Sequence, residues 1–276
     1  MPGKLIRFIA LNLLVASASG GPVMAQTDDV VQLLDAAVAG SHRSEANKQR
    51  DQYRHPKQTL MFFGLRPDMT VVEITPGGGW YTEILAPVLH DRGKYYAAAL
   101  RITDNSPAYF KKMDANYRAK LNSNPAVYGN VTLVHFDPAS PEFAPAGSAD
   151  LVVTFRNVHN WAQAGSAEAM FRGFAAALAP GGYLGVVEHR AKPGTPFEQQ
   201  VKSGYMTEEY VIGLARKAGF SLVEAKEINA NPKDTKDHPG GVWNLLPNLR
   251  NVPEVDKAKM RAIGESDRMT LLFVKN

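Results

Sequence analysis

The fold of this 276-residue chain is decided by the stretch Val71-Val72-Glu73-Ile74-Thr75-Pro76-Gly77-Gly78-Gly79-Trp80-Tyr81-Thr82. Its first four residues are a short apolar run with one acid, which is typical of a buried strand. Three glycines then interrupt the run, and the residues from Trp80 to Leu89 have the apolar spacing of a helix. The pattern predicts a strand, a glycine turn and a helix. Such a turn lets backbone approach a ligand, and the free N–H groups at the helix start favour a carboxylate or phosphate.

The glycine spacing excludes two common nucleotide-binding motifs. The dinucleotide fingerprint needs a glycine where Thr82 stands, and the phosphate loop needs Gly-Lys-Ser/Thr, which this stretch lacks. The stretch resembles motif I of class I S-adenosylmethionine-dependent methyltransferases, an acid followed by x-Gly-x-Gly-x-Gly. Glu73, Gly77 and Gly79 match that motif, and Thr75 replaces its first glycine. A tight strand-to-helix turn in any α/β protein stays open as the alternative.

A second motif further along the chain extends the resemblance. Leu178-Ala179-Pro180-Gly181-Gly182 is similar to the Leu-x-Pro-Gly-Gly turn before the fifth strand of that family, and its physics is a helix stop followed by a glycine turn. The resemblance covers Lys57 to Lys275 and is closest to a group of exported bacterial methyltransferases. It implies an α/β fold: one Rossmann-like, mostly parallel seven-stranded sheet, with helices on both faces and an antiparallel last strand. We expect the strands at residues 71–74, 95–100, 131–136, 151–155, 184–187, 221–228 and 269–274.

The resemblance implies a binding site for S-adenosyl-L-methionine at the carboxyl ends of the strands, where open α/β sheets place their ligands. The expected cofactor-binding residues are Glu73, Thr75, Gly77, Gly79, Asp137 and Asn157. In the family, an acid at the place of Asp137 accepts a hydrogen bond from the adenine amino group, although an Asp-Pro turn cap explains this residue equally well. A side chain at Gly79 is expected to fill the space between turn and ligand. The second strand ends at Leu100-Arg101 without the acid that binds the ribose hydroxyls in the family.

Candidate catalytic residues follow the fourth and fifth strands. His159 stands just after the apolar run 151–155, in a region that resembles motif IV of the family, where substrate and methyl group meet. Glu188 and His189 end the fifth strand. Each of the three is a candidate base for a proton of the acceptor. The alternatives are a hydrogen-bonded loop histidine at 159 and a surface ion-pair cluster at 188–190.

Composition bounds the other possibilities. The chain is 45% hydrophobic and 21% charged, which is ordinary for a globular protein. It has no cysteine, so disulfides and thiolate chemistry are excluded. The net charge of +4 includes Lys4 and Arg7, and the small remainder gives no sign of a nucleic-acid partner. The histidines form no His-x-x-x-His or His-Glu-x-x-His pair, so no metal site is predicted.

Residues 1–25 have the pattern of a signal peptide. Lys4 and Arg7 precede an apolar run from Ile9 to Ala18, and Val23-Met24-Ala25 fits a signal peptidase site before Gln26. The run is too short to span a bilayer comfortably. We therefore expect export, to the periplasm, with no stable membrane span after cleavage. An N-terminal membrane anchor and a buried helix are the alternatives.

Two further segments carry expectations. Residues 26–56 are expected to form an N-terminal helical cap on an α/β domain at 57–276, with a helix over Asp28 to Val38. The strongly polar stretch Ser41 to Arg54 favours a solvated helix face or loop, whereas such N-terminal helices lid the cofactor pocket in the resembled family. Residues 229–268 are expected to form a long functional or mobile loop.

The resemblance implies methyl transfer from the sulfonium of S-adenosyl-L-methionine to an acceptor that the sequence does not identify, whether a small molecule or another substrate. A non-catalytic exported binding protein that retains the fold is the alternative, because the ribose-binding acid is missing and an exported enzyme has no obvious supply of the cofactor. A dehydrogenase ranks third, since its glycine spacing differs. The sequence leaves the oligomeric state open.

Overall fold

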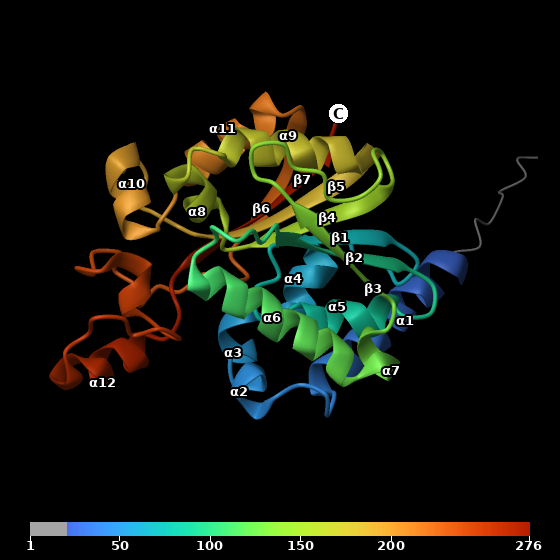
Figure 1. Ribbon diagram of the computed structural model, residues 1–276, viewed down its shortest axis with the longest axis horizontal. Helices are drawn as coiled ribbons and strands as arrows, with labels where there is room; N and C mark the ends of the chain where they lie inside the picture. The colour runs from blue at the N-terminus through green and yellow to red at the C-terminus, as the bar shows by residue number, and fades with distance from the viewer. Residues whose placement is uncertain (1–20) are drawn as a thin grey trace, which may run out of the picture.

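The computed structural model describes residues 21–276, in which seven strands form one sheet (Figure 1). The strands are β1 (Thr70–Ile74), β2 (Lys94–Leu100), β3 (Val131–Phe136), β4 (Ala149–Phe155), β5 (Leu178–His189), β6 (Phe220–Lys226) and β7 (Arg268–Lys275). Their order is β3-β2-β1-β4-β5-β7-β6, and only β7 runs antiparallel to its neighbours, β5 and β6. The predicted fold, mostly parallel with an antiparallel last strand, is confirmed.

Helices cover both faces of the sheet (Figure 1). One face carries α1 (Gly21–Ala39), α4 (Pro56–Phe62), α5 (Thr82–Leu89), α6 (Ala108–Ser123) and α7 (Pro125–Tyr128), with the short helices α2 (Glu45–Lys48) and α3 (Asp51–Arg54) between α1 and α4. The other carries α8 (Val158–Gln163), α9 (Ala167–Ala177) and α11 (Glu208–Lys217), and α10 (Phe197–Ser203) lies next to α8. The segment before β7 holds η1 (Gly241–Asn244) and α12 (Glu254–Ile263). Within residues 21–276, no helix combines the length and apolarity needed to cross a membrane.

The central strand β1 contributes side chains to a hydrophobic core on each face, because successive strand residues point to opposite sides of a sheet. Val72 belongs to the core that α9 and α11 complete, with Phe171 and Leu214. Val71 belongs to the core under α1 and α5, with Leu34 and Ile84. Helix α1 therefore shares its core with the sheet that carries the glycine turn.

Three expectations about these segments need correction. Helix α1 begins at Gly21, earlier than the helix expected over Asp28 to Val38. Residues 1–20 of the expected signal peptide lie outside the described part of the chain, and cleavage before Gln26 stays a prediction. The expectation of a solvated polar stretch is wrong for Arg43 and Arg54, which are buried and paired with Asp51 and Glu265 at 2.7 and 3.2 Å. The expected loop at 229–268 contains η1 and α12. Helix α12 buries no residue.

Candidate functional site

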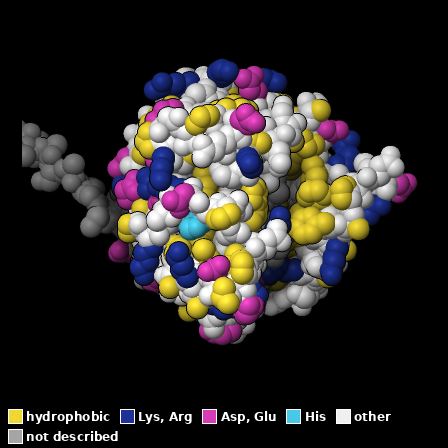
Figure 2. All heavy atoms as spheres, turned by 90° about the vertical axis from the view of Figure 1, so that its left-hand side faces the viewer, with side chains coloured by type: hydrophobic (Ala, Val, Ile, Leu, Met, Phe, Trp, Pro, Cys, Tyr) yellow, Lys and Arg dark blue, Asp and Glu magenta, His cyan; other side chains and the backbone are white. Residues whose placement is uncertain are grey.

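A cavity of about 840 Å³ opens at the carboxyl ends of the parallel strands. Each of five strands contributes lining at or just past its end: Thr75 after β1, Leu100 on β2, Phe136 on β3, Asn157 after β4 and His189 on β5. The strand order reverses between β1 and β4, and an open α/β sheet binds its ligands at such a crevice. The volume lies within the range of small-molecule sites. Figure 2 shows this hollowed face, with apolar side chains at its rim and basic side chains inside.

Two segments outside the sheet complete the wall of the cavity. Asn47, Arg50 and Arg54 come from the N-terminal segment, and Trp243 and Arg250 come from the segment before β7. Trp243 contacts the ring of His159 edge-on, with 6.1 Å between ring centroids. Residues of the polar stretch 41–54 and of the expected loop 229–268 therefore form part of the cavity wall.

Trp80 fixes the N-terminal segment to the glycine turn. Its indole N–H donates to the carbonyl oxygen of Asn47 at 3.0 Å. The guanidinium groups of Arg43 and Arg54 lie 5.1 and 4.6 Å from its ring centroid, within the range of cation–π contacts. Next to it, Tyr81 stacks on Phe155 with 3.5 Å between centroids. These contacts hold the segment 41–54 beside the mouth of the cavity.

The glycine turn has the conformation that the motif requires. Gly77 and Gly79 have φ of +60° and +76°, where a side chain is strained, and Thr75 also has a positive φ of 55°. A Cβ at Gly77 would meet no atom of the described residues within 4 Å, and Gly77 lines the cavity. A Cβ at Gly79 would meet Tyr117 and Lys120 of α6 at 2.9 Å. The expected reason for Gly79 is therefore wrong: this glycine admits α6, and the space that a ligand can enter lies at Gly77.

Glu73 is buried under α5, beside the cavity. Its carboxylate accepts hydrogen bonds from the hydroxyls of Tyr95 and Thr82, the second at 3.1 Å. The hydroxyls of Thr82 and Tyr117 lie 2.9 Å apart, so the network joins β1, β2, α5 and α6. Burial raises the pKa of Glu73 to about 7, although both hydrogen bonds act to lower it. Glu73 thus braces the glycine turn from inside the core.

Asp137 lies outside the cavity wall, although its neighbours Phe136 and Pro138 line it. Its side chain is exposed and accepts a hydrogen bond from the Ala139 backbone N–H at 2.9 Å, which is the turn cap that the sequence left open. The hydrogen bond to adenine stays a prediction. At the end of β2, Leu100 lines the cavity where the resemblance leads one to expect an acid.

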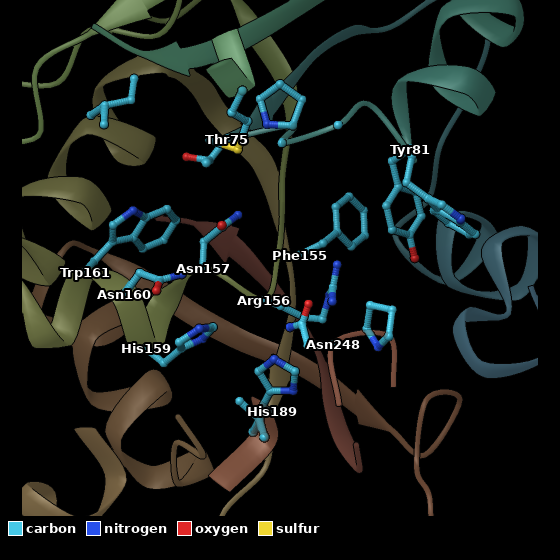
Figure 3. Close-up of a pocket in the computed structure, with 18 of the residues that line it drawn as sticks. Thr75, Tyr81, Phe155, Arg156, Asn157, His159, Asn160, Trp161, His189 and Asn248 are labelled. Atoms are coloured by element: carbon cyan, nitrogen blue, oxygen red, sulfur yellow. The ribbon is translucent and has the colours of Figure 1, made fainter. Parts of the chain in front are cut away.

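Asn157 connects the ends of the two central strands. Its side-chain amide donates to the Ile74 carbonyl oxygen at 3.0 Å and to the Thr154 hydroxyl at 3.1 Å. The side chain is buried and lines the cavity (Figure 3). It therefore fixes the shape of the crevice between β1 and β4, whatever the ligand is.

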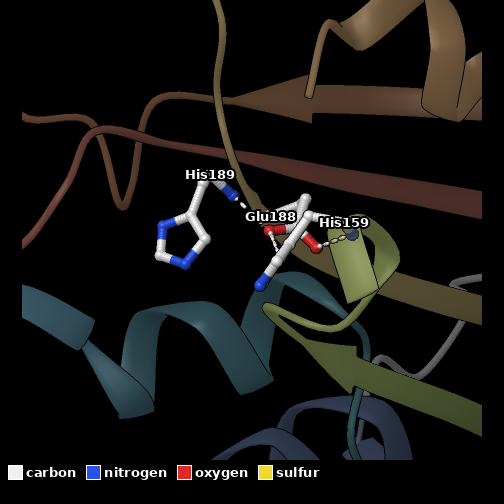
Figure 4. A group of neighbouring side chains, drawn as sticks. All are labelled: His159, Glu188 and His189. Carbon is white, nitrogen blue, oxygen red and sulfur yellow. Dashed lines mark hydrogen bonds and ion pairs between the residues drawn. The ribbon is translucent and has the colours of Figure 1, made fainter. Parts of the chain in front are cut away.

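His159 and Glu188 form a buried pair from α8 and β5 (Figure 4). The Nδ1 atom of His159 lies 3.0 Å from one carboxylate oxygen of Glu188, and its backbone N–H donates to the other at 3.3 Å. The backbone N–H of His189 donates to Glu188 at 2.7 Å. Because Glu188 is fully buried, the surface-cluster interpretation is wrong for it. The carboxylate fixes the ring orientation of His159 and leaves Nε2 as the nitrogen without a partner among the described residues.

His189 lies beside His159, with 5.2 Å between ring centroids. Its Nδ1 atom is 2.5 Å from the hydroxyl of Ser266. Burial lowers the pKa of His189 well below its usual value, and the neighbouring charges of His159, Arg156, Arg268 and Arg54 act in the same direction. The ring is therefore neutral at physiological pH.

The same three residues have the composition of a metal site. One ligand atom from each of His159, Glu188 and His189 lies within 4.8 Å of the others. Motif spacing did not reveal this cluster, because its members come from α8 and β5 and meet only in the fold. Two histidines and a carboxylate suit a divalent transition metal such as Zn²⁺. The oxygens of Glu188 already accept three hydrogen bonds, which favours an orienting role for it over a ligand role.

The fold brings most of the expected site residues together and adds others. Six of them line one cavity: Glu73, Thr75, Gly77, Asn157, His159 and His189. Glu188 lies behind His159, whereas Gly79 and Asp137 face elsewhere. The sequence did not single out the aromatic and basic lining residues Arg50, Trp80, Tyr81, Arg156 and Trp243. For Arg50, the excess of basic residues over acids in Ser41 to Arg54 is the sequence signal that could have indicated a role in the site.

Comparison with known proteins gives matches in structure alone. No protein-family model and no curated protein sequence matches the chain. A SAM-dependent methyltransferase from Aquifex aeolicus superposes with a TM-score of 0.56 at 16% identity, over 83% of this chain and 93% of its own. The [4+2]-cyclase SpnF has a TM-score of 0.56 at 15% identity, over 91% and 94%. A candidate sarcosine dimethylglycine methyltransferase from Galdieria sulphuraria has 0.55 at 14%, over 91% and 98%.

At these identities the likeness establishes the fold. Together with the strand order, it shows that the chain has the fold of class I S-adenosylmethionine-dependent methyltransferases. Because SpnF is a cyclase, this fold also hosts other reactions, so function has to be argued from the site.

Proposed function

We propose that the protein is an S-adenosyl-L-methionine-dependent methyltransferase. The observation that carries the proposal is that one cavity reaches from the open glycine Gly77 to the oriented imidazole of His159. A cofactor at the turn and an acceptor at the histidine would thus share one cavity. Gly77 lines the cavity and a Cβ there would meet no described atom within 4 Å, so a ligand can approach the backbone of the turn.

The residues divide into two groups in this proposal. Thr75, Gly77 and Asn157 would hold the cofactor at the turn, with Glu73 and Gly79 supporting the turn from behind and Asp137 as the adenine contact that the resemblance implies. The bound cofactor supplies an electrophilic methyl group on a sulfonium. The cavity wall orients the acceptor so that its nucleophile lies in line with that group.

His159 is the proposed base. Its Nδ1–H donates to Glu188, so Nε2 carries the lone pair and can take the proton that the acceptor loses. Glu188 positions the ring and stabilises the imidazolium that results. His189, neutral and adjacent, is the second candidate and would hydrogen-bond the acceptor through Nε2.

A non-catalytic binding protein that keeps the fold is the second candidate function. The observation that favours it is the end of β2, where Leu100 lines the cavity at the place of the ribose-binding acid of the resembled family. Such a protein would bind a small ligand in the same cavity without methyl transfer.

The N-terminal expectations become part of the proposal. Residues 1–25 would direct export to the periplasm, residues 26–56 would act as a cap over the cavity mouth, and residues 57–276 would form the methyltransferase-like domain. The contacts of Trp80 with Asn47 and Arg54 support the cap. N-terminal sequencing of periplasmic protein should begin at Gln26, and intact Met1 in the cytosol would contradict export.

The deciding experiment is isothermal titration of the protein with S-adenosyl-L-methionine, S-adenosylhomocysteine and NAD. We expect both adenosyl ligands to bind and NAD not to bind. Failure of both adenosyl ligands at millimolar concentration would reject the methyltransferase and leave the binding protein as the better account. Binding of NAD alone would point to a dehydrogenase.

A further inference from the structure

Three arginines surround one buried carboxylate on the cap side of the cavity. Glu265 accepts hydrogen bonds from Nε of Arg50 at 2.6 Å, Nε of Arg54 at 3.2 Å and an Nη of Arg268 at 2.5 Å. Burial alone would raise the pKa of Glu265, but the positive charges of Arg268, Arg54, Arg156 and Arg50 hold it well below its usual range. Glu265 is therefore ionised, and a single negative charge faces several guanidinium groups.

The cluster keeps unused hydrogen-bond donors. The Nη2 atoms of Arg50 and Arg54 are buried and have no hydrogen-bond partner among the described residues. The Arg54 side chain is almost fully buried, and both arginines line the cavity. A buried guanidinium donor without an acceptor is costly, which points to an acceptor that a ligand brings.

Arg156 adds a further guanidinium group at the carboxyl end of β4. It directly follows β4, lines the cavity and has a φ of +63°, which is rare for a non-glycine residue (Figure 3). Its side chain makes no hydrogen bond or ion pair with any residue in the described part of the chain. Burial lowers the pKa of Arg156 to about 10, while Glu265 acts to raise it, so the side chain remains charged at neutral pH. Strained backbone of this kind is typical of residues held in place for a ligand.

The charge balance of the cavity is strongly positive. Among the described residues that line it, four are arginines (Arg50, Arg54, Arg156 and Arg250), and Glu73 is the single acid. The carboxyl group of Glu73 is already bonded to Tyr95 and Thr82. S-adenosyl-L-methionine has a sulfonium, an ammonium and one carboxylate, so the cofactor itself is a net cation. The arginines outnumber Glu73 and Glu265, so an anionic second ligand would offset their positive charge beside the cationic cofactor.

We infer that Arg54 and Arg156 bind the acid group, a carboxylate or a phosphate, of an anionic small-molecule acceptor. The identification of the anion as a methyl acceptor rests on the proposed function. The anion site itself rests on the arginines alone. A guanidinium fork matches either acid group with paired hydrogen bonds. The methionine carboxylate of the cofactor has the same chemistry, so the experiment must separate these two sources.

The experiment is isothermal titration with inorganic phosphate and with malonate in low-salt buffer, first on the protein alone and then on protein saturated with S-adenosylhomocysteine. The test variant is Arg156→Gln, because the side chain of Arg156 makes no hydrogen bond or ion pair with the described residues, so we expect its loss to leave the fold intact. Arg66→Gln is the matched control: Arg66 is exposed, pairs with Asp68 and precedes β1 at the other end of the sheet. Circular dichroism checks that both variants stay folded.

We expect the anions to bind both forms of the wild-type protein. Arg156→Gln should weaken anion binding about tenfold or more, the loss of a charge-assisted hydrogen bond, while S-adenosylhomocysteine binding changes little. Arg66→Gln should change neither. Arg156→Lys should recover part of the affinity, since it keeps the charge but loses the fork.

Three results would overturn the inference. One is the absence of anion binding to wild type at millimolar concentration. Another is unchanged anion binding in Arg156→Gln. The third is competition between the anions and S-adenosylhomocysteine, together with a particular loss of affinity in Arg156→Gln. The variant would no longer bind S-adenosylhomocysteine but would still bind 5′-methylthioadenosine, which lacks the carboxylate. The arginines would then bind the carboxylate of the cofactor. Anion binding that depends on Arg156 in a protein that binds no adenosyl ligand would support the anion site and reject methyl transfer.

Discussion

Thr75 and Arg156 hold equivalent positions on neighbouring strands: each is the first residue after its strand, β1 or β4, and each has a positive φ, 55° and 63°. Both line the cavity. Left-handed backbone at a β-branched or long side chain costs free energy, of the order of 1–3 kcal/mol. The crevice at the centre of the sheet is thus bordered by two strained residues, one on each side.

Thr75→Gly is expected to stabilise the protein, because glycine adopts positive φ without strain. The gain should be about 1 kcal/mol, since glycine also increases the entropy of the unfolded chain. Urea unfolding measures this gain. As a control, Thr132→Gly on the exposed face of β3 should destabilise by roughly 0.5–1 kcal/mol. Equal destabilisation by both variants would show that Thr75 is not strained.

Only part of the fold and site could be predicted from the sequence. The glycine spacing and the Leu-x-Pro-Gly-Gly turn predicted the sheet, because each is a local conformational requirement that short stretches express. The direction of a Cβ is not local: Gly79 faces α6 and Gly77 faces the cavity, and only the packing of Tyr117 decides this. The arginine cluster gathers residues from α3, β7 and the end of β4, so no window of sequence contains it.

Gly77→Val is expected to abolish binding of an adenosyl ligand, because its side chain would enter the cavity beside the turn. Strain from positive φ is a competing explanation. Gly147→Val controls for it: Gly147 has a φ of +65°, has no atom within 4 Å of a Cβ and precedes β4 at the opposite end of the sheet. Calorimetry should show loss of binding in Gly77→Val alone. Equal affinity of the two variants would place the ligand elsewhere.

The stability of the protein should depend on Glu73 at mildly acidic to neutral pH. Its pKa is about 7 in the folded protein against 4.5 as the ordinary value, so the folded state holds the proton more tightly than the unfolded chain. The protonated form therefore favours folding: its contribution is complete below about pH 4.5 and is lost as pH rises through 7. The difference in pKa corresponds to about 3 kcal/mol.

Glu73→Gln tests this dependence, because the amide keeps an acceptor for Tyr95 and cannot ionise. Urea unfolding of wild type and variant should be compared at about pH 5 and about pH 8. The wild type should lose more stability than the variant between the two values. Parallel pH profiles would mean that Glu73 titrates normally.

The last prediction concerns the pair His159 and Glu188. One oxygen of Glu188 accepts hydrogen bonds from Nδ1 of His159 and from the backbone N–H of His189, and the other accepts from the backbone N–H of His159. In Glu188→Gln the amide oxygen takes only one of these two places, and the NH₂ group, which is a donor, takes the other. Placed against Nδ1 of His159, that donor favours the tautomer with the proton on Nε2, which cannot take a proton from an acceptor. Methyl transfer should fall by about 10²–10⁴, the contribution of a general base, while adenosyl-ligand binding stays unchanged.

Nitrogen-15 NMR of the imidazole reports the tautomer directly, without an acceptor in hand. Wild type should show the proton on Nδ1 of His159, and Glu188→Gln should shift it to Nε2. Glu198→Gln, an exposed acid on α10, is the control and should leave the spectrum of His159 as in wild type. A wild-type ring that is protonated on Nε2 would contradict the role of His159 as base. In that case His189, whose Nδ1 faces Ser266, would become the base to test by the same measurement with Ser266→Ala.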